Sequence, residues 1–272
     1  MSSLPPLPAG WQNPIKTRLH ADEAVIGITI TVNHVETAAQ AAALGFDFLW
    51  IEMEHSPVSL DTLRAIVLAT RGLPAVPLAR VPVNALWTAK RVLDAGVLGV
   101  IFPFTSTVGL AAQAADACRY PPLGQRGSGA GLAGFRWPAP EGYHDFADRN
   151  VVVVAMIEEA SAVDQIDRIA ATPGVDVLFV GPSDLSFSLG LRGDMSHPQV
   201  EAAMDRVLAA ARENGKAAGR FVADPDGIQR ALDRGFRFIQ TGTELNLMSA
   251  GARQLLAPLG RWQTGVKEPG TY

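Results

Sequence analysis

The sequence predicts an α/β protein whose fold class is a (β/α)8 barrel in one domain. Short apolar runs alternate with segments of helical periodicity along the 272 residues. This alternation is typical of a parallel sheet, because parallel neighbours need crossover connections. Eight strand–helix pairs can be placed in the chain, and a barrel of this kind usually occupies about 250 residues. A doubly wound open sheet is the alternative architecture.

Each expected strand is followed by a segment in which apolar residues recur at helical spacing. The strands are expected at residues 24–31, 46–53, 75–81, 98–102, 151–157, 175–180, 216–222 and 236–241. The helices are expected at residues 35–44, 60–70, 85–94, 109–118, 162–171, 198–214, 225–234 and 245–256. No linker divides these units, so we expect a lead-in over residues 1–23, the barrel over 24–258 and a tail over 259–272.

The composition excludes several classes of protein. Hydrophobic residues make up 48% of the chain and charged residues 18%, which allows a large core and argues against disorder. The net charge of −4 leaves no basic excess for a nucleic acid. The single cysteine, Cys118, argues against a disulfide framework and a thiolate zinc site. Neither a signal peptide nor a membrane span of about 18 apolar residues is expected, so a soluble cytoplasmic enzyme is predicted.

The C-terminal ends of the strands carry the chemistry of a (β/α)8 barrel, so polar residues there are the site candidates. The second expected strand ends in Glu52, Glu54 and His55. A histidine beside an acid is a competent general base near neutral pH. Arg80 ends the third strand, where a guanidinium can fix a carboxylate or stabilise an enolate oxygen. The alternatives are a solvated loop histidine and a surface arginine in an ion pair.

Two further acids follow neighbouring strands, Glu158 after the fifth and Asp184 after the sixth. An all-oxygen pair of this kind suits a hard cation such as Mg²⁺ or Mn²⁺. Helix capping is the alternative for Asp184, but it explains one acid and not the pair. The turn over residues 181–184 also offers backbone N–H groups at a helix start, where a substrate carboxylate can bind.

A glycine motif and the lysines argue against two other chemistries. Residues 129–134 match the dinucleotide pattern G-x-G-x-x-G, but they follow a loop and not a strand, so the structural context is wrong. We interpret residues 120–142 as a mobile loop near the site, acting as a lid. None of the four lysines follows a strand, which disfavours an imine-forming aldolase.

Several segments together resemble the HpcH/HpaI aldolase family of metal-dependent, class II pyruvate aldolases. They are FDFLWIEMEHSP, LARVP, LDAGVLGVIFPF, RYPPLGQRG, IEEASAVDQID, VDVLFVGPSDLS and GDMSHPQV. Each is weak alone, but their shared order over residues 27–256 is specific. The resemblance implies a barrel whose last helix is exchanged between subunits and a homo-oligomer, a hexamer in this family.

The resemblance also implies a role for each residue at the strand ends. His55 resembles the proton acceptor, and Arg80 resembles the residue that stabilises the enolate. Glu158 and Asp184 resemble the ligands of a divalent metal, which is Mg²⁺, Mn²⁺ or Co²⁺. Ser183 and Asp184 would offer backbone N–H groups to the carboxylate of the substrate.

Two other positions extend the resemblance and limit it. Asp94 resembles an aspartate that raises the basicity of the histidine. Met156 stands where the family usually has a substrate-contacting glutamine, two residues before the first metal ligand. A thioether accepts hydrogen bonds only weakly, so the pocket should be more apolar here and its substrate different.

The resulting hypothesis is a divalent-metal aldolase that cleaves or forms 4-hydroxy-2-oxo acids. Its partners would be an aldehyde and a small 2-oxo acid, either pyruvate or a relative such as hydroxypyruvate. The first alternative keeps the metal for an oxaloacetate decarboxylase, a macrophomate synthase-like enzyme or a lyase of CoA thioesters. The last of these should show a basic nucleotide patch, which the sequence lacks. The second alternative is a barrel that binds a 2-oxo acid without catalysis.

Overall fold

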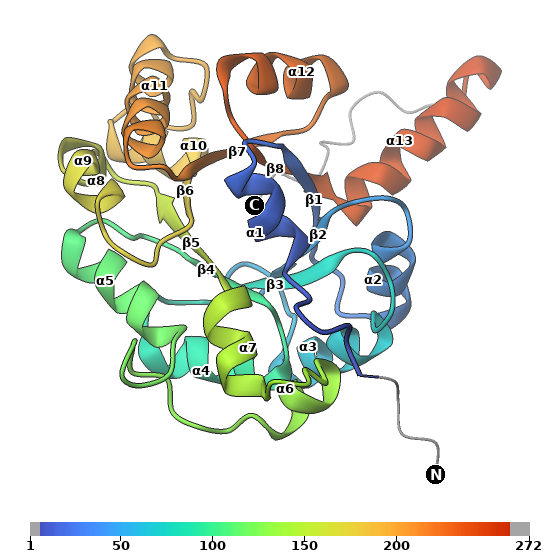
Figure 1. Ribbon diagram of the computed structural model, residues 1–272. Coiled ribbons are helices and arrows are strands. Elements are labelled where there is room, and N and C mark those ends of the chain that lie inside the picture. The colour runs from blue at the N-terminus through green and yellow to red at the C-terminus, as the bar shows by residue number, and fades with distance from the viewer. Residues whose placement is uncertain (1–5, 262–272) are drawn as a thin grey trace.

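A computed structural model describes residues 6–261 and confirms the barrel (Figure 1). Eight parallel strands pair in chain order, and β8 closes the sheet by pairing with β1. This closure excludes the doubly wound alternative. The strands are β1 (Val25–Ile30), β2 (Phe48–Glu52), β3 (Val76–Arg80), β4 (Gly99–Phe102), β5 (Val152–Ile157), β6 (Val177–Val180), β7 (Ala217–Val222) and β8 (Phe238–Thr243).

The expected helices are all present outside the strands, and the described residues add four short helices that the periodicity did not predict. The additions are α1, α6, α7 and α10, and the helix expected at residues 162–171 is divided into α8 and α9. The helices are α1 (Pro14–His20), α2 (Val35–Ala42), α3 (Leu60–Ala69), α4 (Leu86–Ala95), α5 (Val108–Ala117), α6 (Gly131–Arg136), α7 (Tyr143–Asn150), α8 (Ala160–Asp164), α9 (Ile166–Ala170), α10 (Pro182–Ser188), α11 (Pro198–Glu213), α12 (Pro225–Arg234) and α13 (Glu244–Leu256), followed by the 3₁₀ turn η1 (Ala257–Leu259).

Aromatic rings fill the interior of the barrel. The ring centroids of Phe48 and Phe238 are 4.3 Å apart, and Phe179 meets Phe238 edge-on at 6.2 Å. Glycines on the facing strands provide the space, because a Cβ on Gly27 would lie 2.1 Å from the Phe48 ring and one on Gly219 would lie 2.7 Å from Phe179. Such alternation of large and small side chains packs the barrel as a solid core.

The N-terminal end of the barrel is closed by α1 and by residues 120–142. The α1 helix begins at Asn13, whose buried side chain accepts a hydrogen bond from Ile15 N at 3.0 Å and so caps the helix. Trp137 packs against Trp11 with ring centroids 5.4 Å apart and donates to Gly96 O at 2.8 Å. Within this chain, residues 120–142 therefore do not form a lid near the site, and that expectation is wrong. The segment returns from α5 to the start of β5, so it covers the end opposite to the strand-end acids.

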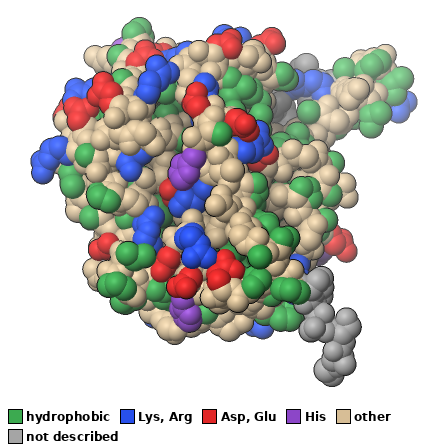
Figure 2. Space-filling model, in the orientation of Figure 1, with side chains coloured by type: hydrophobic (Ala, Val, Ile, Leu, Met, Phe, Trp, Pro, Cys, Tyr) green, Lys and Arg blue, Asp and Glu red, His purple; other side chains and the backbone are tan. Residues whose placement is uncertain are grey.

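Figure 2 views this N-terminal face, on which basic side chains gather beside α1. A hollow of about 310 Å³ opens there, and its lining includes His20, Arg212, Lys216 and Arg237. Lys216 directly precedes β7 and donates a hydrogen bond to Val175 O at 2.7 Å. It therefore lies at the N-terminal end of β7, where the expected strand at residues 216–222 places it. The hollow is remote from the candidate residues at the other end.

The last helix leaves the body of the barrel. In Figure 1, α13 projects away from the other helices, and Glu244 is its one buried residue. Leu247, Met248 and Leu255 on α13 expose 46%, 66% and 73% of their surface. Over residues 6–261, no helix is long and apolar enough to cross a membrane.

Candidate active site

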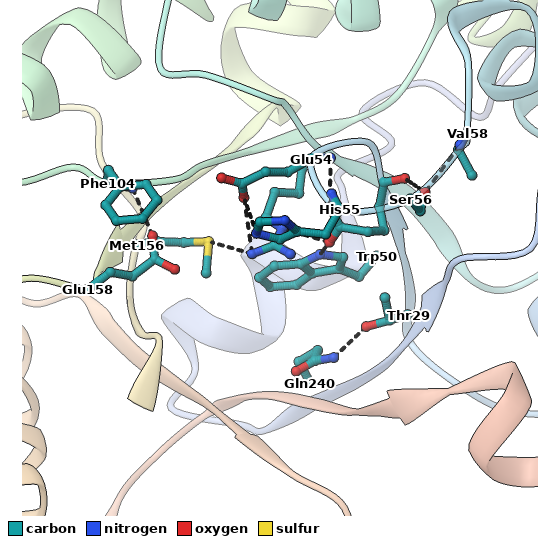
Figure 3. Close-up of polar contacts among 12 residues, drawn as sticks. Thr29, Trp50, Glu54, His55, Ser56, Val58, Phe104, Met156, Glu158 and Gln240 are labelled. Atoms are coloured by element: carbon teal, nitrogen blue, oxygen red, sulfur yellow. Dashed lines mark hydrogen bonds and ion pairs between the residues drawn. The ribbon is translucent and has the colours of Figure 1, made fainter. Parts of the chain in front are cut away.

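Arg80 ends β3 and is held by two carboxylates, one at the end of β2 and one just beyond it. Figure 3 shows the neighbouring side chains of Glu54, His55, Met156 and Glu158. Its Nε lies 2.6 Å from Glu52 Oε2, and its Nη1 lies 3.2 Å from Glu54 Oε2. These pairings follow from the register, because Glu52 pairs directly with Arg80 between β2 and β3. The arginine is 3% exposed, and its Nη2 has no hydrogen-bond partner among residues 6–261. One end of the guanidinium is thus fixed while the other keeps an unused donor.

Glu52 shapes the turn that carries the histidine. It is fully buried and accepts hydrogen bonds from Glu54 N at 2.7 Å and His55 N at 3.1 Å through Oε1. Its Oε2 accepts from Trp50 Nε1 at 3.2 Å. Glu52 was named with the strand end but received no site role from the sequence. The signal for one was a charged residue at an inward, core-facing position of an apolar strand.

His55 lies at the rim, above this buried pair. Its Nε2 is 3.7 Å from Glu54 Oε2, and 45% of its side chain is exposed. The predicted proximity of a histidine and an acid is therefore present, with Glu54 as the acid. Burial raises the pKa of Glu54 to about 7; Arg80 opposes this shift, whereas Glu52 and Asp184 add to it.

Glu158 ends β5 as a nearly buried carboxylate at 2% exposure. Its Oε2 accepts a hydrogen bond from Phe104 N at 2.8 Å. A Cβ on Gly181 would lie 2.7 Å from Glu158 Oε1, so glycine is needed here for the carboxylate to fit. Burial raises the pKa of Glu158 to about 7, against the opposing effects of the Phe104 N–H and Arg80.

Asp184 and Ser183 lie in the first turn of α10, beside Glu158 in the same pocket. The helix starts at Gly181 with Pro182 as its first residue and has no side-chain cap. The backbone N–H groups of a first turn lack intrahelical partners, so those of Ser183 and Asp184 are available. The structure thus brings together the two predicted metal ligands and the predicted carboxylate-binding turn.

The pocket between these groups has mostly apolar walls and a cavity volume of about 40 Å³. Met156 on β5 is 3% exposed, and its sulfur lies 3.9 Å from Arg80 Nη1. Aromatic and sulfur-containing side chains surround it, together with one amide. They are Trp50, Phe179, Met195, Phe221 and Gln240. The expected apolar character of the pocket beside Met156 is present.

Asp94 does not join the cluster within this chain. It lies in the last turn of α4, which runs from the end of β3 back to the N-terminal end of the barrel, whereas His55 follows the opposite end of β2. Its carboxylate is paired with Arg126 Nη2 at 3.1 Å. The expected pairing of Asp94 with His55 is therefore not met in one protomer, because the length of a barrel helix separates them. It would need a second copy of the chain.

The donor set fits a divalent cation. Glu158 and Asp184 lie in the same pocket, burial raises the pKa of Glu158 and of nearby Glu54 to about 7, and the neighbouring carboxylates add to both shifts. Over residues 6–261, no group of three or more His, Cys, Asp or Glu side chains is arranged to hold a metal. The chain would therefore contribute two carboxylate oxygens and leave the remaining positions to water and substrate, as Mg²⁺ sites commonly do.

Charged groups gathered at the strand ends distinguish a barrel enzyme from a barrel that serves as a scaffold, and this chain has the features of an enzyme. Residues 26–250 match the family described as HpcH/HpaI aldolase/citrate lyase. The chain belongs to this family, as its motifs predicted.

The relatives of this chain are carbon–carbon lyases. It is 39% identical to a hydroxypyruvate/pyruvate aldolase of Paraburkholderia phytofirmans over 90% of this chain and 97% of the relative. It is 34% identical to a 4-hydroxy-2-oxo-heptane-1,7-dioate aldolase of Escherichia coli, over 96% and 100%. A solved family member from Burkholderia cenocepacia superposes with a TM-score of 0.85 at 38% identity and covers 92% of this chain and 100% of that one. These relatives place the chain among the aldolases.

Proposed function

We propose that this protein is a divalent-metal-dependent aldolase that cleaves or forms 4-hydroxy-2-oxo acids, with pyruvate or hydroxypyruvate as the 2-oxo acid. The observation that carries the proposal is the buried Arg80, fixed by Glu52 and Glu54 with Nη2 unused beside Glu158. A divalent cation held by Glu158 and Asp184 would act as a Lewis acid on the 2-oxo acid. The preference among Mg²⁺, Mn²⁺ and Co²⁺ is a matter for measurement.

Arg80 supplies the fixed positive charge of the reaction. Cleavage breaks the C3–C4 bond, and its electron pair moves onto the 2-oxo oxygen of the departing enolate. Arg80 lines the pocket, and its Nη2, which has no partner among residues 6–261, can donate to that oxygen as its charge develops. A preorganised donor in a site that excludes water stabilises such charge without reorganisation.

His55 moves the protons. In cleavage, it accepts the proton of the 4-hydroxyl group, directly or through a water, while the aldehyde forms. It then returns a proton to C3 of the enolate, which gives the 2-oxo acid. Its half-exposed position at the rim, 3.7 Å from Glu54, suits exchange with solvent.

The first turn of α10 would orient the substrate. Its free N–H groups at Ser183 and Asp184 can receive the carboxylate, because anions bind at helix N-termini. Met156 presents a weak acceptor to the same pocket, so this wall contributes contact and shape.

We also propose an oligomer in which α13 packs against a second copy. The apolar side chains that α13 exposes, including Met248 at 66% and Leu255 at 73%, are costly to leave in water, and the projecting helix suits exchange between subunits. An assembly would also give Asp94 of one copy a route to His55 of another. The specific assembly that we propose is a hexamer, as the family resemblance implies.

The test is an aldol assay with a metal control. Dialysis against a chelator should abolish release of pyruvate from a 4-hydroxy-2-oxo acid, and Mn²⁺ or Mg²⁺ should restore it. A matched reaction with oxaloacetate separates the decarboxylase alternative. Full activity in the chelated protein would refute the proposal. Release of pyruvate from oxaloacetate but not from the 4-hydroxy-2-oxo acid would also refute it.

A further inference from the structure

Gln240 is an amide in the floor of the pocket that the proposed reaction does not use. It lies on β8 two residues beyond Phe238, whose ring belongs to the packed interior. Alternation along a strand places residues two apart on the same side, so Gln240 points inward and forms the layer above. It is 5% exposed and lines the pocket with Trp50 and Phe179, whose rings are 4.9 Å apart. A polar amide therefore interrupts a floor that is otherwise aromatic.

Only one side of this amide has a protein partner. Its Nε2 donates to the hydroxyl of Thr29 on β1, and Figure 3 shows its Oε1 pointing away from that hydroxyl. Over residues 6–261, the structure gives Gln240 Oε1 no hydrogen-bond donor. The threonine hydroxyl can donate as well as accept, so the amide can offer the pocket either an acceptor or a donor. A hydroxyl group is complementary to both.

The position of β8 decides which part of the substrate Gln240 meets. In the closed barrel, β8 is bonded to β7 and β1, so it lies across the mouth from β4 and its neighbours. Arg80 and Glu158 lie on that far side, at the ends of β3 and β5. A 2-oxo acid is nearly flat and would turn its carboxylate and 2-oxo oxygens toward these groups. Its C3 then points toward the opposite wall, where Gln240 lies.

We propose that Gln240 is a specificity-determining residue that hydrogen-bonds a hydroxyl substituent on C3 of the donor, and so favours a 3-hydroxy-2-oxo acid over pyruvate. This inference rests on the proposed aldolase function. The amide presents to the pocket one hydrogen-bonding group that no residue among 6–261 occupies, and a hydroxyl on C3 can bond to it. Pyruvate fits the same space but leaves that group unmatched.

The experiment compares two donors in the metal-supplemented enzyme. Hydroxypyruvate and pyruvate are each combined with acetaldehyde, and kcat/KM is measured for both in the native protein and in Gln240→Met, which keeps the length of the side chain and removes the amide. We expect Gln240→Met to lower the hydroxypyruvate/pyruvate ratio on the order of ten-fold, because one neutral hydrogen bond is lost. The matched control is Met156→Leu, in the same pocket, which should change both donors by a similar factor.

Two results would overturn the inference: a hydroxypyruvate/pyruvate ratio that Gln240→Met leaves unchanged, or a selective loss that appears only when glycolaldehyde replaces acetaldehyde. The last result would place the hydroxyl on the acceptor. Failure of the aldolase proposal is distinguishable, because native protein would then turn over neither donor. Calorimetric binding of the two acids to the Mn²⁺-loaded protein then decides the inference. Gln240→Met should weaken hydroxypyruvate selectively, and equal binding changes would refute it.

Discussion

Replacing Glu52 with glutamine should destabilise the protein and reduce its activity, although the two side chains have nearly the same shape. Glu52 Oε2 receives two donors, Arg80 Nε at 2.6 Å and Trp50 Nε1 at 3.2 Å, and its Oε1 receives two backbone N–H groups. A glutamine has one acceptor oxygen, so its NH₂ group must face one of these pairs of donors. The Arg80 and Trp50 donors are buried, so water cannot replace the acceptor that they would lose.

The magnitude follows from the two donors that lose their acceptor. A buried donor without a partner costs about 1–3 kcal/mol, and more when it is charged. Arg80 keeps Glu54 at 3.2 Å, which places the sum near the lower bound of the range for a broken buried ion pair, about 3 kcal/mol. For a domain of this size, about 3 kcal/mol corresponds to a fall in Tm of roughly 6–12 °C.

Differential scanning calorimetry of Glu52→Gln measures the shift, and the aldol assay follows kcat/KM. The matched control is Glu54→Gln, which removes the other carboxylate of Arg80. Its carboxyl already has a pKa of about 7, so neutralising it should cause a smaller fall in Tm. Equal melting temperatures for Glu52→Gln and the native protein would show that Glu52 does not hold Arg80 and the turn in the way described.

Three further predictions concern the metal and the proton. Glu158→Gln should abolish Mn²⁺ binding measured by electron paramagnetic resonance, and retained affinity would exclude Glu158 as a ligand. His55→Asn should lower kcat by about 10²–10⁴-fold while Mn²⁺ affinity stays unchanged, and a loss of affinity would contradict a role limited to proton transfer. The pKa values of Glu54 and Glu158 are raised from 4.5 to about 7, so both groups bind protons more tightly in the folded state. The stability that they contribute is complete below pH 4.5 and is lost as the pH rises through about 7. The Tm of chelated protein should therefore fall between about pH 5 and about pH 8, and Mn²⁺ should restore it at about pH 8. A Tm that Mn²⁺ leaves unchanged at about pH 8 would count against the acidic cluster as a metal site.

The sequence predicted the barrel and the residues at the ends of its strands because those features follow from local patterns. Period-two burial places successive residues on opposite faces, and the barrel rule then selects one end of each strand. That reasoning found Arg80, Glu158 and Asp184, which line one pocket. It also found His55, whose Nε2 lies 3.7 Å from Glu54 Oε2. It treated Glu52 as part of a strand end, because the inward position of a charged residue in an apolar strand does not show which residue of the neighbouring strand will pair with it.

Features that depend on long-range packing were not predictable in this way. The helix α6 and the side chain of Trp137 lie against the N-terminal end of the barrel through contacts such as Trp11 with Trp137. A glycine-rich segment alone is equally compatible with a lid at the other end. The expected role of Asp94 came from the resemblance and not from the strand-end rule. Asp94 lies in the last turn of α4, which is the end of that helix away from His55 within this chain.

The fixation of Arg80 also has an evolutionary consequence. Catalytic groups are commonly held at some expense of stability, so their loss often makes a protein more stable. Here the guanidinium also neutralises Glu52, a carboxylate with no exposed surface, and its removal would leave that charge uncompensated in the core. A lineage that lost the chemistry could not discard Arg80 without also replacing Glu52. The pair would therefore be inherited together, even in descendants that no longer catalyse the reaction.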